Sequence, residues 1–406
     1  MHCSNPVALL TLVVASTALG QVEQADVPKR FCEAWTKATT PGRDYDEVLE
    51  ATLRSVKAGG DWGELFGGIR NHAKAFHLQM LREAAKEHHT TFSCEAFEFP
   101  AGRPTGKMLL AGDDVLTATA LAADDTGVFW LSCERSRNRN CRLLRLEGTA
   151  SKVLEANLPE AGPHSQLLLD GKDVVMLVGG NLLSVPKVGG TRTVLATKID
   201  RPRALVREGD FLVLIAGDEV VRLPRKGGEP VVVGRWRNDA LGKNFPGTNQ
   251  PDFLAPYAGG FYFNGSEGPL FYVPSPGKPP EKVATGSNPR FPVMLGGALY
   301  FQTVGSEDVY SLNKFDLASR KVTPLGPQGA GTGCVADSVG QLLCNQVARG
   351  DWPGKASIVR WKQGAPRYDA VATGVGQVSL IAGDSKRVYW VDRWYGGLMA
   401  APRGSN

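Results

Sequence analysis

The sequence predicts a mainly β fold, a seven-bladed β-propeller preceded by a small α-helical domain. Three observations lead to this prediction. The 406 residues include 48 glycines and 26 prolines, as expected for a chain that turns often. Four-stranded units recur from about residue 104 to the C-terminus. The repetitive part begins with a stray strand and ends on an incomplete unit, and together these two pieces make one further blade.

The first twenty residues, 1–20, are predicted to be a signal peptide. Val7 to Leu19 is an uncharged apolar run, too short to span a bilayer and close in length to the apolar region of a signal. Cleavage of a signal peptide before Gln21 needs small residues three and one positions before the cut, and Ala18 and Gly20 occupy these positions. The alternative is a buried N-terminal helix. The signal peptide predicts an exported protein, periplasmic or extracellular. No later run of apolar residues reaches about 18, so we expect no transmembrane segment.

Six cysteines follow the predicted cut, and their positions predict three disulfides. Sequence proximity and topology favour one of the possible pairings. One pair encloses the helical region and the other two each bracket a short loop: Cys32–Cys94, Cys133–Cys141 and Cys334–Cys344. An even cysteine count at such spacings is typical of an oxidising compartment. The sequence contains no Cys-x-x-Cys motif, so neither a redox site nor a zinc site is indicated.

Residues 21–103 are predicted to form a small helical domain of two or three helices. Residues 45–53 place apolar side chains at helical spacing, and so does the stretch from Leu65 to Leu81. Gly59-Gly60 can end one helix and Asp61 can cap the next. The predicted disulfide would stabilise so small a core. Because this domain has a core of its own, we expect its removal to do far less harm than deletion of residues 396–406.

Residues 104–406 are predicted to form the propeller. The clearest unit, residues 164–198, holds four β-rich runs separated by turns at Asp170-Gly171, Gly179-Gly180 and Gly189-Gly190. The next unit matches it element by element. The fourth-strand endings recur at roughly 44 residues on average, within the range of propeller blades. A sandwich fits these lengths poorly.

The two ends of the repetitive part predict how the ring closes. After Gly374 the chain has only three strands, and the third is at residues 398–402. Before the first complete unit, residues 106–112 form a strand with no blade of their own. We therefore predict that these two strands pair and complete a seventh blade. Such closure protects edge strands that an open array would expose.

Two sequence features resemble known propeller families. Val388-Tyr389-Trp390-Val391-Asp392 and Val128-Phe129-Trp130-Leu131 resemble the second-strand signature of YWTD-type propellers. Val185-Pro186-Lys187, followed by Gly189-Gly190, resembles the third-strand ending of those proteins and of TolB-like bacterial propellers. The resemblance covers residues 104–406 and implies the fold. Asn313-Lys314 and Trp361-Lys362 stand where other units have Pro-Lys.

The sequence contains no metal, cofactor or nucleophile motif. The helical domain holds four histidines whose spacing does not bring a pair to ligand distance on one face, so we expect them to be solvated: His72, His77, His88 and His89. No Gly-x-Ser-x-Gly or Walker-type sequence occurs. We therefore predict no catalytic residue, metal or cofactor. Asp124, Asp125, Asp170 and Asp384 lie in turns, where we expect them to bond the turn backbone.

One face of the propeller collects the residues that could bind a ligand. Connections from second to third strand, and from fourth strand to the next first strand, emerge on the same side. The candidate ligand-binding residues in these connections are Arg135, Arg137, Arg139, His164, Arg203, Trp236, Arg237, Asn288, Arg290, Asp351, Trp352, Trp394 and Tyr395. Exposed tryptophan and arginine are typical of recognition surfaces. The alternative is that the aromatics cover blade edges.

The sequence favours a non-enzymatic binding protein with an unknown protein, small-molecule or glycan ligand. The net charge of +5 is not gathered into Lys/Arg runs, so nucleic-acid binding is not indicated. The runner-up is a funnel-type enzyme, a lyase or hydrolase acting on a sugar or lactone, because propellers host both classes. A third reading is a structural surface protein that the helical domain anchors to a partner.

Overall fold

The chain is described by a computed structural model that covers residues 26–40, 43–56, 58, 60–69, 74, 77–99, 104–134, 139–160, 165–235, 253–264, 269–274, 278, 280–283, 285, 289–304, 310–329, 333–346, 356–361 and 368–404. The predicted signal peptide lies outside these residues. Within them, no helix is long and apolar enough to cross a bilayer.

The N-terminal part of the described chain is helical, as predicted, but has more helices than two or three. It comprises α2 (Val27–Ala38), α3 (Tyr45–Val56), α4 (Gly60–Ile69), α5 (His77–Glu87) and the single turn α6 (Glu95–Glu98). Below, these five helices and the segment Thr90–Cys94 are called the helical head. The Leu65–Leu81 stretch, which has helical spacing in sequence, is divided between α4 and α5.

Aromatic side chains fill the interior of the helical head. Phe31, Trp35, Tyr45 and Phe97 are all fully buried. Phe97 meets Phe31 and Trp35 edge to face, with ring centroids 5.2 and 4.6 Å apart. Such pairs add to the free energy of burial. The disulfide Cys32–Cys94 joins α2 to the residue before α6, so it holds Phe97 in this cluster.

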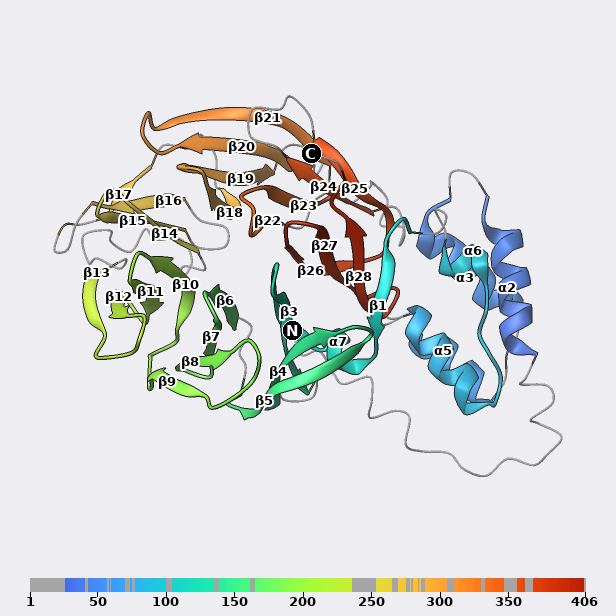
Figure 1. Cartoon of the computed structure of the whole chain (residues 1–406). Coiled ribbons are helices and arrows are strands. Elements are labelled where there is room, and N and C mark those ends of the chain that lie inside the picture. The colour runs from blue at the N-terminus through green and yellow to red at the C-terminus, as the bar shows by residue number, and fades with distance from the viewer. Residues whose placement is uncertain are drawn as a thin grey trace.

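The rest of the described chain forms seven four-stranded antiparallel sheets arranged around an axis (Figure 1). Blade 1 consists of β2 (Ala118–Asp124), β3 (Gly127–Glu134), β4 (Arg139–Glu147) and β5 (Ala150–Leu158). Blade 2 consists of β6 (Gln166–Asp170), β7 (Asp173–Val178), β8 (Asn181–Pro186) and β9 (Thr193–Ala196). Blade 3 consists of β10 (Arg203–Glu208), β11 (Phe211–Ala216), β12 (Glu219–Pro224) and β13 (Val231–Arg235). The short helix α7 (Asp113–Leu116) precedes blade 1.

The remaining blades repeat the same meander. Blades 4 and 5 are β14 (Phe253–Tyr257), β15 (Gly260–Asn264), β16 (Leu270–Val273), β17 (Glu281–Lys282); and β18 (Arg290–Leu295), β19 (Ala298–Val304), β20 (Tyr310–Asp316), β21 (Lys321–Gly329). Blades 6 and 7 are β22 (Cys334–Ala336), β23 (Leu342–Gln346), β24 (Ala356–Trp361), β25 (Tyr368–Val375); and β26 (Val378–Gly383), β27 (Arg387–Asp392), β28 (Gly397–Pro402) with β1 (Lys107–Ala111). The predicted seven-bladed fold is confirmed.

The core lies between the blades. Each blade packs face to face on both neighbours, so its second and third strands are buried on both sides and carry nearly continuous apolar runs. Val174 and Met176 of β7, for example, share one buried cluster with Phe129 and Leu131 of β3. The first strands of neighbouring blades contact one another and lie innermost.

Ring closure follows the predicted pairing. β1 pairs antiparallel with β28, with Lys107 opposite Ala400 and Ala111 opposite Gly397. The N-terminal strand is therefore the outermost strand of the C-terminal blade. All three predicted disulfides are also present. Cys133–Cys141 and Cys334–Cys344 each join neighbouring strands within one blade, whereas Cys32–Cys94 closes the helical head.

The helical head and the propeller share one apolar cluster. It runs from Phe31 and Trp35 through Phe97 to Trp394 and Met399 of blade 7. Figure 1 shows the head beside β1 and β28. The sequence-based expectation of a separate core in the head is therefore wrong, because the head's aromatic side chains pack directly on blade 7.

Candidate functional site

The two ends of the propeller differ in how they are closed. We call the end formed by first-to-second and third-to-fourth connections the turn face, and the other end the loop-rich face. On the turn face, several first-to-second connections are two-residue turns, such as residues 125–126 and 171–172. At the other end, β13 is followed by β14 after residues 236–252 and β23 by β24 after residues 347–355, and both segments lie outside the described residues. The longest connections therefore belong to the loop-rich face.

Ion pairs between blades hold the turn face together. In each pair, an acid at the end of a first strand meets a base that follows the third strand of the next blade: Asp124 with Lys187, Asp170 with Arg225, and Asp337 with Arg403. The Asp170 carboxylate accepts two bonds from Arg225, at 2.6 and 2.5 Å, so it spans two blades instead of bonding its own turn. Asp384 does bond its turn, through the Lys386 and Arg387 N–H groups.

The loop-rich face has charged residues at the axial ends of the inner strands. Arg203 is the first residue of β10 and Arg290 is the first residue of β18, so two of the predicted residues lie at this end of the ring, on blades 3 and 5. Phe253 begins the first strand of blade 4 between them.

The connection into blade 3 has an unusual backbone. Lys198, Arg201 and Ala204 all have positive φ, at 55°, 38° and 53°, a region that residues with a side chain seldom occupy. We call residues 198–204 the blade 3 entry loop. Strained backbone of this kind costs roughly 1–3 kcal/mol per residue and gathers at functional sites. Nothing in the sequence signals this feature, because none of the three residues is a glycine.

Contacts with the second-to-third turn of blade 3 hold the blade 3 entry loop in place. The Gly217 N–H donates to the Asp200 carbonyl at 2.7 Å. Gly217 has a φ of 54°, in the left-handed region that favours glycine. The Asp200 carboxylate also pairs with Arg201 at 3.3 Å, and both side chains are about two-thirds exposed. The loop therefore presents charged groups to solvent from a fixed backbone.

The other predicted residues of the face are placed as follows. Arg139 begins β4. The residues that lie outside the described part of the chain are Arg135, Arg137, His164, Trp236, Arg237, Asn288, Asp351 and Trp352. Trp394 and Tyr395 are buried, with 0% and 4% of their surface exposed, so the expectation that they are exposed aromatics is wrong.

The helical head covers Trp394 and Tyr395. The Trp394 indole Nε1 donates to the Glu98 carbonyl at 3.1 Å, and its ring lies 5.1 Å from that of Phe97. Phe99 stacks on Tyr395 with centroids 5.7 Å apart. An aromatic pair in a loop can bind a ligand or another part of the chain, and the two uses have the same local sequence. Here the pair binds the head.

Asp392 shapes the backbone that carries these two aromatics. Its carboxylate is buried and accepts N–H bonds from Gly376, Trp394 and Tyr395, at 2.8, 3.1 and 3.2 Å. Burial raises the pKa of Asp392, and the backbone N–H donors oppose that shift. The sequence motif Val388–Asp392 marked this residue for the fold, but did not indicate that it organises the docking site of the head.

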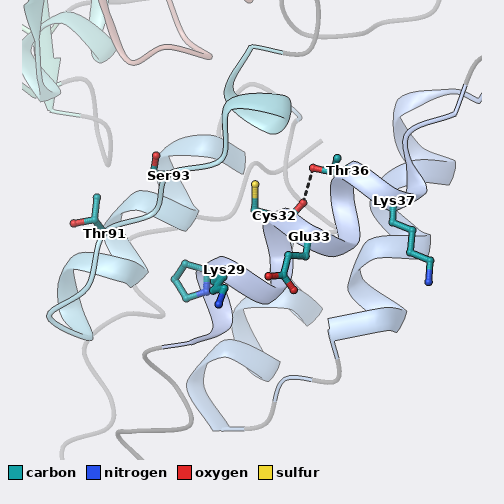
Figure 2. Close-up of a pocket in the computed structure, with 8 residues that line it drawn as sticks. Lys29, Cys32, Glu33, Thr36, Lys37, Thr91 and Ser93 are labelled. Carbon is teal, nitrogen blue, oxygen red and sulfur yellow. Dashed lines mark hydrogen bonds between the residues drawn. The ribbon is translucent and has the colours of Figure 1, made fainter.

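A groove whose lining residues are mostly of polar types, called the polar groove below, runs along the helical head (Figure 2). It has a volume of about 610 Å³ and lies between α2 and the segment Thr90–Cys94. The residues that line it are Pro28, Lys29, Cys32, Glu33, Thr36, Lys37, Thr91 and Ser93. Of these, the charged and hydroxyl side chains are exposed. The sequence offered no signal for this groove, because its two walls are about sixty residues apart.

The histidines of the head do not form a metal site in the described part of the chain. His77 is buried, and its Nδ1 atom lies 2.9 Å from the Tyr45 hydroxyl, so the expectation that it is solvated is wrong. His88 stacks on Trp62. Among the described residues, no group of three or more His, Cys, Asp or Glu side chains is placed to hold a metal ion.

No protein-family model matches the sequence, and no curated protein matches it. Solved structures with a similar fold include the extracellular domain of BT4673 from Bacteroides thetaiotaomicron, at 11% identity and TM-score 0.49, over 75% of this chain and 41% of that chain. PorZ, a surface component of the type-IX secretion system of Porphyromonas gingivalis, matches at 12% identity and TM-score 0.48, over 74% of this chain and 38% of that one.

BamB from Moraxella catarrhalis matches at 14% identity and TM-score 0.41, over 70% of this chain and 85% of that chain. This chain therefore spans less than half the length of BT4673 and of PorZ, and most of the length of BamB. At these identities the likeness concerns the propeller fold.

Proposed function

We propose that the protein is an exported, non-enzymatic binding protein that takes its ligand on the loop-rich face. Its export rests on the predicted signal peptide, residues 1–20, and on three disulfides, which are typical of oxidising compartments. We further propose that residues 21–103 and 104–406 are its two structural parts, the first docked on the second.

The blade 3 entry loop carries this proposal. It combines a strained backbone with exposed charge, beside Arg203 at the axial end of an inner strand. Several two-residue turns and ion pairs between blades instead close the turn face, an arrangement that stabilises the ring. Arg201 and Arg203 favour an acidic ligand, since arginine binds carboxylates with paired hydrogen bonds.

An array of neutral, sialylated and uronic-acid-containing oligosaccharides tests the proposal. We expect retention on the acidic glycans, and about tenfold weaker binding when Arg201→Ala and Arg203→Ala are combined, since two charge-assisted hydrogen bonds are lost. Lys172→Ala, an exposed lysine in a two-residue turn of the turn face, is the matched control and should bind normally.

Two outcomes would contradict the proposal. Retention that the arginine substitutions leave unchanged, or no retention at all, would remove the loop-rich face as the site for this ligand class. Cleaved or unsaturated sugar products, detected by mass spectrometry after incubation, would favour the alternative lyase or hydrolase instead.

A further inference from the structure

The three disulfides differ in how far solvent can reach them. Four of the six cysteines belong to the propeller and are at most 9% exposed: Cys133, Cys141, Cys334 and Cys344. In the helical head, Cys94 is 1% exposed, but Cys32 is partly exposed and lines the polar groove. Figure 2 shows the Cys32 sulfur between α2 and the segment that carries Ser93. Cys32–Cys94 is therefore the disulfide that has a partly exposed cysteine.

The charges of the groove suit thiol–disulfide exchange. Lys29 lies one helical turn before Cys32 on α2, whereas Lys37 lies farther along the helix. Both lysines are exposed and line the groove, and neither forms an ion pair with the described residues. A nearby ammonium group favours the thiolate form of an approaching thiol. It also stabilises the thiolate that leaves. Glu33 is the one acid that lines the groove, so lysines outnumber it.

Cys32–Cys94 holds the contact between head and propeller. Cys94 directly precedes α6, and its N–H donates to the Glu98 carboxylate at 2.8 Å. The carbonyl of the same Glu98 accepts the Trp394 indole N–H, and Phe97 packs on the Trp394 ring. A single helical turn therefore joins the disulfide at one end to blade 7 at the other.

We infer that Cys32–Cys94 is a thiol-operated latch. A dithiol reductant opens it from the groove before either propeller disulfide, and its opening loosens α6 from Trp394. One thiolate of the dithiol attacks the Cys32 sulfur and forms a mixed disulfide, and Cys94 leaves as a thiolate. The second thiol of the reductant then closes its own disulfide and releases Cys32. Two electrons pass to the protein, and each cysteine takes a proton.

Graded reduction of the mature protein with dithiothreitol tests the order of opening. After capping with N-ethylmaleimide and peptide mapping, we expect Cys32 and Cys94 to be labelled at a reductant concentration about tenfold below that needed for the other four cysteines. Combining Lys29→Ala with Lys37→Ala should slow this step severalfold. Lys86→Ala, an exposed lysine of α5 outside the groove, should leave it unchanged.

Hydrogen exchange then tests whether the latch loosens the head. In protein reduced and capped at Cys32 and Cys94 alone, amides of residues 93–99 and 393–399 should exchange about tenfold faster than in the oxidised protein. Cys32→Ser with Cys94→Ser should show the same exchange without reductant. Cys133→Ser with Cys141→Ser, which opens a disulfide within blade 1, should not.

Either of two results would overturn the latch. The propeller disulfides could open at the same or a lower reductant concentration, or the capped protein could exchange at the oxidised rate in both segments. The capped wild-type protein keeps the test decisive even if the serine variants do not fold, because its disulfide forms before it is opened.

Discussion

At the scale of single residues, buried charges join neighbouring blades. The Lys187 side chain is 6% exposed and donates to Asp124, whose carboxylate also accepts the Thr126 N–H at 2.9 Å. Burial alone would raise the pKa of Asp124, but the hydrogen bonds from Lys187 and Thr126 outweigh it and lower the pKa. The folded protein therefore holds this carboxylate in its charged form to lower pH than the unfolded chain does.

This lowered pKa predicts a pH dependence for Asp124→Asn. The carboxylate contributes stability above its unfolded pKa of about 3.9, and the contribution is lost as the pH falls through the folded pKa. At pH 7 we expect the substitution to cost roughly 1–3 kcal/mol, the usual value of hydrogen bonds to a charged group. Melting curves from pH 7 down to 3 should show a Tm deficit that is constant to about pH 5 and shrinks below pH 4.

Asp210→Asn is the control for this experiment. Asp210 lies in the corresponding turn of blade 3, but its side chain is 96% exposed and 3.9 Å from Arg225. An exposed pair of this kind contributes little, so its Tm should match that of the parent at every pH. A deficit for Asp124→Asn that persists undiminished at pH 3 would mean that the carboxylate's charge is not what joins the blades.

Residue-scale features were the least predictable from sequence. Asp124 does bond its own turn through the Thr126 N–H, as expected from the sequence. Its ion-pair partner Lys187, like the partner Arg225 of Asp170, lies in the next blade, at least fifty-five residues along the chain. Sequence reasoning pairs an acid with its own turn, because that contact is local. His77 was misjudged for the same reason, since its partner Tyr45 comes from another helix.

At the scale of elements, one strand closes the ring. β1 adds to the edge of β28 as the outer strand of blade 7, and the residue before it, Gly106, passes over the buried ring of Trp390. A Cβ on Gly106 would lie 2.2 Å from Trp390 Cη2 and 2.7 Å from Cζ2. Because Trp390 is fully buried, it has little room to move aside.

Gly106→Ala should therefore weaken closure of the ring. We expect a loss of about 1–3 kcal/mol, the usual cost of overpacking a core, measured by urea denaturation. The control is Gly68→Ala in α4, where an added Cβ meets nothing within 4 Å. That substitution should be neutral or stabilise by up to about 1 kcal/mol, because alanine favours helix. Equal stability of the two variants would show that Gly106 is not tightly enclosed.

The elements of the propeller were predictable because short strands and glycine turns recur. The repeat shows which strand of each unit is the first and which is the fourth. The last unit therefore lacks its fourth strand, and the unassigned strand at residues 106–112 is predicted to pair with residues 398–402. The helices were less predictable. Leu65 to Leu81 has helical spacing throughout, but the structure divides it between α4 and α5. Periodicity identifies helical residues more reliably than it identifies where one helix ends.

At the scale of the whole molecule, the packing of the head on blade 7 was not predictable. Glu98 and Trp394 are 296 residues apart, and no repeat or periodicity relates them. Strand order correctly assigned Trp394 and Tyr395 to the loop-rich face, but could not show that the head occupies that position. The candidate face is consequently narrower than the sequence suggested, because its blade 7 sector is already covered.

The shared core predicts what happens when the head is removed. A variant that begins at residue 104 would uncover Trp394 and Tyr395, which the head now buries. Each large aromatic buries roughly 150–250 Å², and an exposed apolar patch of that size promotes association. We expect little soluble monomer by size-exclusion chromatography, and a lower Tm for what remains.

Adding Trp394→Ser and Tyr395→Ser should restore part of the monomer yield, because the patch becomes polar while the ring stays closed by β1 and β28. If the headless protein is monomeric and melts with the parent, the head contributes nothing to the stability of blade 7 and the shared cluster is only a contact surface.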